Sequence, residues 1–261
     1  MFSIAAAVLA VVLIVLERTG KLNLQKKGGA FGAMLAAALM AGFYFADCAR
    51  FIAALGVKFS GWTGDEGEAR AFGSTSTGLL VVRGLLLLIC IVPAAGGLIY
   101  TLQALVRKSA ERELPRSDHF YGESRVKGLI SRGTVAAIGF IAFMVIMVLC
   151  LLPYMDRLLA SFVIFNPMLL LFITVFTLGL ALLPIVGLMI SMNGMFMLLC
   201  FGIGSAGLVF YLFSAILSAA AAVLSAKYGL MQKSRAVLYG LLGLIPGWNL
   251  LALWLMKKDI S

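Results

Sequence analysis

The longest uncharged stretch of the chain, residues 158–226, constrains the fold most, because it contains no Asp, Glu, Lys or Arg. A helix needs about 20 apolar residues to cross the hydrocarbon layer of a bilayer, so this stretch is long enough for at least two crossings. Charged residues make up 12% of the chain, about half of the roughly 25% that is usual in soluble domains. The sequence therefore predicts an integral membrane protein.

Further apolar segments of similar length follow one another along the chain, and none shows the alternating pattern of a barrel strand. Backbone polar groups need partners inside hydrocarbon, which helices supply within one segment. We predict a single all-α domain over residues 1–261, a polytopic bundle of about seven transmembrane helices. The predicted spans are residues 1–16, 29–50, 78–105, 133–153, 167–190, 195–217 and 236–256.

The distribution of Lys and Arg predicts the orientation, because cytoplasmic loops are enriched in these residues. Four lie between spans one and two, seven lie in the loop 107–132, two lie after residue 256, and six lie on the opposite side of a seven-span chain. This count favours an external N terminus and a cytoplasmic C terminus. Three short spans within 158–226 would instead give eight spans and an external C terminus, and the charge count does not separate the two arrangements.

Three charged residues, Asp47, Arg50 and Arg83, lie within predicted spans. Asp or Arg at the centre of a span costs roughly 2.5–3.5 kcal/mol. Asp47 and Arg50 come late in the second span and Arg83 comes early in the third, so we expect all three at similar depth in the outer third of the membrane. An ion pair between Asp47 and Arg83 would offset much of the cost. The cluster is either a structural pair, with Arg83 also able to extend to the surface, or a gate or substrate-binding charge.

Prolines and amides mark candidate breaks in the helices, because proline removes a backbone donor and kinks a helix. Asn166 immediately precedes the fifth span, Pro167 begins it, Pro184 lies within it, and Pro246 and Asn249 lie within the seventh. Broken helices line the binding sites of many transporters. The alternative is a set of plain kinks in a packed bundle.

Small residues predict close helix packing. Ser214, Ser218 and Ala222 recur every four positions, and Gly243 and Gly247 form a G-x-x-x-G pair. Small side chains let helix backbones approach closely in membranes. These faces serve either packing within the chain or association with a second chain.

The predicted cytoplasmic loop holds the only histidine, His119, beside Asp118 and Glu123. An acid–base pair there would suit an enzyme, although a solvated loop explains the same residues. The four cysteines form no C-x-x-C pair, so we predict no metal site and no cofactor. Nucleic acid is not an expected partner, because no separate basic domain is present.

The leading functional hypothesis is a non-catalytic membrane subunit of a transport or export complex in a plasma membrane or bacterial inner membrane. Its expected partners are the lipid bilayer and other membrane or cytoplasmic subunits, with the loop 107–132 as a docking segment. One alternative is a membrane-embedded enzyme acting on a lipid or a lipid-linked substrate through Asp118, His119 and Glu123. The other is a membrane scaffold or assembly protein built on the small-residue faces.

Overall fold

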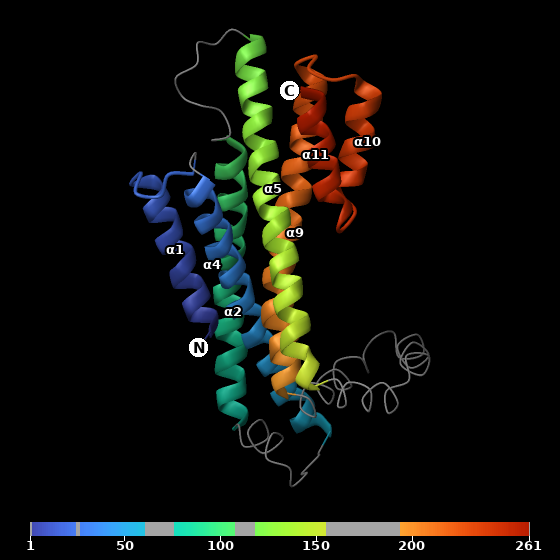
Figure 1. Cartoon of the computed structure of the whole chain (residues 1–261). Coiled ribbons are helices and arrows are strands. Elements are labelled where there is room, and N and C mark those ends of the chain that lie inside the picture. The colour runs from blue at the N-terminus through green and yellow to red at the C-terminus, as the bar shows by residue number, and fades with distance from the viewer. Residues whose placement is uncertain (1, 25–26, 61–75, 108–117, 155–193, 261) are drawn as a thin grey trace.

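The computed structural model describes residues 2–24, 27–60, 76–107, 118–154 and 194–260 (Figure 1). These residues contain helices and no strand, which confirms the predicted all-α class for the described part of the chain. The helices are α1 (Phe2–Arg18), α2 (Lys27–Ser60), α4 (Thr77–Arg107), α5 (Asp118–Leu151), the short 3-10 helix η1 (Leu152–Tyr154), α9 (Gly194–Lys227), α10 (Lys233–Gly243) and α11 (Trp248–Ile260).

Four helices are long and apolar enough to cross a membrane. They are α2, α4, α5 and α9, with candidate spans at Gly28–Leu55, Thr77–Arg107, Gly122–Cys150 and Phe201–Lys227. Their outer faces carry large apolar side chains, such as Leu88, which is 67% exposed, and Val92, which is 73% exposed. Hydrocarbon solvates such a surface and water does not. The structure therefore indicates an integral membrane protein.

The helices α5 and α9 run antiparallel, as Figure 1 shows. Gly122, near the start of α5, lies against Tyr228, just after the end of α9. Gly133, later in α5, accepts a hydrogen bond from Ser214, which comes more than a dozen residues before Tyr228. A single crossing over residues 167–190, as predicted, would make α5 and α9 parallel. The seven-span order therefore does not hold between these two helices, and residues 167–190 themselves lie outside the described residues.

The expected span over 236–256 is also not one helix. The helices α10 and α11 contain 11 and 13 residues, so at 1.5 Å per residue each is about 16–20 Å long, short of the roughly 30 Å hydrocarbon layer. They pack against each other in opposite directions, because Asp259 near the end of α11 pairs with Arg235 at 3.4 Å and accepts a hydrogen bond from Tyr239 at 3.0 Å. The hairpin α10–α11 thus returns the C terminus to the end from which it entered (Figure 1).

Local chemistry explains the turn between α10 and α11. Pro246 has no amide hydrogen, and Gly247 has a φ of 84°, a left-handed conformation that glycine adopts readily. The amides of Leu244 and Ile245 donate to carbonyls three residues earlier, and Tyr211 of α9 donates to the carbonyl of Leu244. These bonds satisfy much of the turn's backbone, which is what a turn inside hydrocarbon requires.

Helix α5 begins at Asp118, fifteen residues before the predicted span 133–153. Most of the described part of the segment 107–132, which we expected to be a loop, is therefore the start of a long helix. Within it, Lys127 and Glu123 form an ion pair four residues apart at 2.6 Å, a spacing that supports a helix. Arg132 is buried and donates to the carbonyl of Leu105, which joins α5 to the end of α4.

Small residues bring the helices close together. Gly97 of α4 faces Ala10 of α1, and a Cβ atom at Gly97 would lie 2.8 Å from that of Ala10. A Cβ atom at Gly42 of α2 would lie 2.9 Å from the carbonyl oxygen of Gly202 in α9. Helix α1 presents one buried stripe with alternating spacings of three and four residues, as expected for a packed helix face. The stripe consists of Ser3, Ala6, Ala10, Leu13 and Glu17.

Candidate functional site

Three helices meet at Asp47 of α2, whose side chain is 1% exposed. Arg83 of α4 donates to Oδ1 of Asp47 at 2.7 Å. The backbone amide and the hydroxyl of Ser3 in α1 donate to Oδ2 at 3.1 and 2.8 Å. Both carboxylate oxygens therefore have donors, and the contacts join α1, α2 and α4 near the end of the bundle opposite the C terminus.

The third residue of the expected cluster lies beside this pair rather than in it. The guanidinium of Arg50 is stacked over the ring of Phe2 at 5.1 Å from its centroid. A cation over an aromatic face is an attractive arrangement, and here it also contacts α1. The structure thus brings Asp47 and Arg83 together and gives Arg50 a separate partner, Phe2 of α1.

A second polar cluster lies where the hairpin α10–α11 packs on α5 and α9. Nδ2 of Asn249 donates to Oγ of Ser214 at 3.0 Å, and Oγ of Ser214 donates to the carbonyl of Gly133 at 3.1 Å. Asn249 is 1% exposed and Ser214 is fully buried. Ser214 lies thirteen residues before the end of α9, which places this cluster about 20 Å along the helix from Lys227.

The small residues named from the sequence meet at the same place. A Cβ atom at Gly243 would lie 2.2 Å from Oγ of Ser218, and one at Gly240 would lie 3.5 Å from Cβ of Ala222. The face of α9 that carries Ser218 and Ala222 is therefore covered by α10 of the same chain. Gly247 is not part of this contact, because it forms the turn of the hairpin.

Two grooves flank the hairpin. The α9–α10 groove has a volume of about 550 Å³, and the α5–α11 groove has a volume of about 890 Å³. Each carries two lysines among mostly apolar residues. The α9–α10 groove is lined by Ala219, Ala222, Val223, Ala226, Lys227, Lys233, Ala236, Val237, Gly240, Leu241 and Leu244. The α5–α11 groove is lined by Lys127, Ile130, Ser131, Thr134, Val135, Ile138, Gly247, Leu250, Leu251, Leu253, Trp254 and Lys257.

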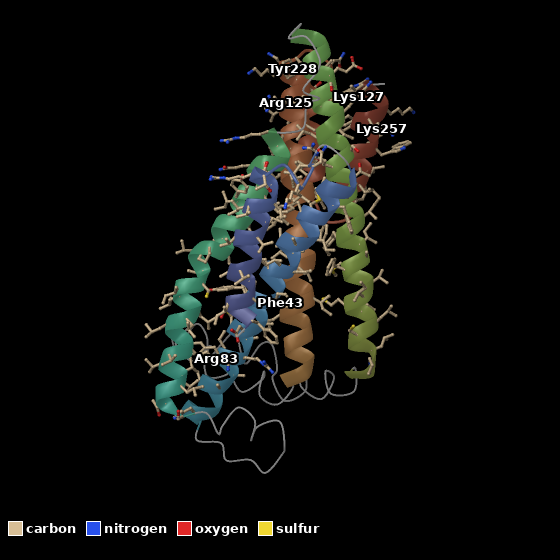
Figure 2. All side chains as sticks on the ribbon, turned by 90° about the vertical axis from the view of Figure 1, so that its left-hand side faces the viewer. Phe43, Arg83, Arg125, Lys127, Tyr228 and Lys257 are labelled. Atoms are coloured by element: carbon tan, nitrogen blue, oxygen red, sulfur yellow. The ribbon has the colours of Figure 1, made fainter. Side chains whose placement is uncertain are left out.

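Figure 2 shows Lys127 and Lys257 close to the end of the bundle that also carries Arg125 and Tyr228, and Arg83 toward the opposite end. The lysines of the α5–α11 groove and the ion pair of Asp47 are thus far apart. They form two separate polar regions at different depths of the bundle.

The residues proposed for acid–base chemistry do not form a described catalytic arrangement. Asp118 and His119 belong to the first turn of α5, but their side chains lie outside the described residues. The carboxylate of Glu123 accepts a hydrogen bond from Lys127 at 2.6 Å. The predicted breaks at Asn166, Pro167 and Pro184 also lie outside the described residues.

Sequence reasoning missed several residues of these regions. Ser3 is a weak signal in an apolar segment, and its two bonds to Asp47 depend on how α1 packs. No sequence pattern indicated Tyr211 or Gly133, because their roles come from contacts with distant segments of the chain. The lysines of the grooves were interpreted only as loop charges.

Comparisons with known proteins gave no match to a family model, to a curated protein or to a solved structure.

Proposed function

We propose that the protein is a non-catalytic membrane subunit of a transport or export complex, and that the hairpin α10–α11 contacts the transported compound. The observation that carries the proposal is a pair of half-length helices with a buried amide, Asn249, just after the break. Transporters build binding sites at such breaks near the membrane midplane, where unwound backbone and helix ends offer polar groups. Non-helical backbone at that depth is tolerated where protein buries it or where it lines a cavity.

Two features favour this function over the alternatives. Glu123, a member of the candidate acid–base group, is engaged with Lys127. The small-residue face of α9, on which a scaffold would depend, is covered by Gly240 and Gly243 of the same chain. Both features fit a subunit that supplies a moving or binding element better than they fit an enzyme or a scaffold protein.

The orientation that we propose is an external N terminus and a cytoplasmic C terminus in a plasma membrane or bacterial inner membrane. It rests on the basic residues at the helix ends, because cytoplasmic segments are enriched in Lys and Arg. At the opposite end, the described residues include Lys58, which donates to Thr77. The helix ends that lie at the proposed cytoplasmic end in Figure 1 are the last turns of α1, α4, α9 and α11 and the first turns of α2 and α10, and they carry Arg18, Lys27, Arg107, Lys227, Lys233, Lys257 and Lys258. Figure 2 shows Arg125 and Lys127 of α5 at the same end.

Cysteine accessibility in intact cells tests the transport role without knowledge of the substrate. In a cysteine-free background, Asn249→Cys and Ser218→Cys place thiols on the face where the hairpin meets α5 and α9. If this face lines a transport path, a water-soluble thiol reagent will modify both positions while the complex is working. Leu238→Cys is the matched control, because Leu238 lies on α10, is 54% exposed and lines neither of the two grooves.

Equal and negligible modification at all three positions would refute the transport path. Purification of the full chain in mild detergent supplies the second measurement, with a stoichiometric membrane or cytoplasmic partner as the expected result. A chain that is isolated alone, and whose hairpin does not react, would leave no support for a transport subunit.

A further inference from the structure

The α5–α11 groove has a charge gradient along its length. On α5 it runs from Lys127 through Ser131 and Thr134 to Ile138, and on α11 it runs in the opposite chain direction from Lys257 to Leu250. Eleven residues separate Lys127 from Ile138, which corresponds to about 16 Å along the helix. This length matches one half of the roughly 30 Å hydrocarbon layer. The groove therefore has a basic mouth and an apolar floor over the depth of one leaflet.

The basic mouth retains donors for an anion. Lys127 donates to Glu123 at 2.6 Å and is still 51% exposed, and an ammonium group has three donors. Lys257 is exposed at the end of α11, and the neighbouring Lys258 lies over the ring of Trp254 at 5.8 Å. The two lysines of the groove, Lys127 and Lys257, thus lie at this mouth with Lys258 beside them, and the described carboxylate that pairs with Lys127 is that of Glu123.

The floor is open to the membrane rather than sealed within the protein. Ile138 is 56% exposed, Leu251 is 40% exposed and Trp254 is 57% exposed. A soluble anion would leave this apolar length unfilled, whereas a phospholipid would place its phosphate between the lysines and an acyl chain along the floor. Basic pockets between membrane helices on the cytoplasmic side bind anionic headgroups in this way.

We propose that the α5–α11 groove binds an anionic phospholipid of the cytoplasmic leaflet, with Lys127 and Lys257 at its phosphate and Trp254 beside its acyl chain. The proposal rests on the proposed orientation, which places this end of the bundle at the cytoplasmic leaflet, but it does not depend on the transport role. Each lysine near an anionic headgroup contributes roughly a fivefold preference, so the two together predict up to about a thirtyfold preference for an anionic over a zwitterionic lipid.

Fluorescence of Trp254 measures this preference directly. The full chain with Trp62→Phe and Trp248→Phe keeps Trp254 as its single tryptophan and is reconstituted into phosphatidylcholine vesicles. Either phosphatidylglycerol or phosphatidylcholine with brominated acyl chains is then added at matched mole fractions, because bromine quenches a nearby indole. We expect brominated phosphatidylglycerol to quench Trp254 at much lower mole fractions than brominated phosphatidylcholine.

Two double variants separate the groove from general attraction to the basic surface. Lys127→Gln with Lys257→Gln should bring the two quenching curves together. Lys227→Gln with Lys233→Gln removes the same charge from the α9–α10 groove on the other side of the hairpin and should leave the preference in place. Equal quenching by both lipids in the unmodified groove would overturn the proposal, as would an equal loss of preference in the two double variants.

Discussion

Replacing Arg83 by Gln is expected to cost more folding free energy than replacing Asp47 by Asn, although both changes break the same ion pair. Arg83→Gln leaves a carboxylate that is 1% exposed and has lost its cationic partner on α4, although the two donors of Ser3 remain. Asp47→Asn leaves a guanidinium that is 24% exposed and sits on a long side chain, so it can extend toward polar surroundings. The group left behind therefore differs in how much solvation it can recover.

The magnitudes follow from these environments. Removal of one partner of a buried ion pair costs about 3–5 kcal/mol, and we expect Arg83→Gln to cost about 4 kcal/mol. Asp47→Asn loses one charge-assisted hydrogen bond, and Asn can still accept from Ser3, so we expect a cost of about 2 kcal/mol. The double variant leaves no unpaired charge, and its cost should be about 3 kcal/mol, well below the sum of the single changes.

The assay is reversible unfolding of the full chain in mixed micelles by SDS titration, followed by helical ellipticity. Arg50→Gln is the matched control, because Arg50 lies on the same helix as Asp47 and its contact among the described residues is with the ring of Phe2, which contributes about 0.5–1 kcal/mol. Equal costs for the two single variants, or additive costs in the double variant, would show that burial of the carboxylate does not determine the free energy lost when this ion pair is broken.

Two further predictions concern the hairpin. Gly243→Ala should destabilise the chain by about 1–3 kcal/mol through overpacking, because the new Cβ would lie 2.2 Å from Oγ of Ser218. Gly240→Ala should be neutral or slightly stabilising, because its Cβ would make an ordinary 3.5 Å contact. The same SDS titration measures both variants. The cost of Gly243→Ala should vanish in a Ser218→Gly background, and its persistence would place the clash elsewhere. Cysteines introduced at Lys233 and Lys257 should react with an impermeant thiol reagent from the same side of the membrane, since the hairpin returns the chain to one end; labelling from opposite sides would restore a full crossing over 236–256.

The sequence by itself determined the class of molecule and the nature of its elements. Long segments without charge have to be helical in hydrocarbon, because each segment must satisfy its own backbone polar groups. The common depth that we predicted for Asp47 and Arg83 followed from their places on consecutive helices, and the structure has them in contact at 2.7 Å. The helix break at Pro246 was also visible in the sequence, since proline and glycine act locally.

Only the tertiary structure decided which way the chain continues after a break. A kinked helix and a hairpin share the same local signals at Pro246 and Gly247, and contacts between distant residues select the hairpin. These contacts are the fit of Gly243 on Ser218, the bond from Asn249 to Ser214, and the pairing of Arg235 with Asp259. Both charge counts, for seven and for eight spans, assumed that residues 236–256 cross the membrane. Each count therefore placed the basic residues before and after this segment on opposite sides, and the two totals hardly differed. The two grooves beside the hairpin could not be predicted from the sequence either. The walls of the α5–α11 groove come from helices more than a hundred residues apart, and those of the α9–α10 groove come from helices whose relative direction is set by packing.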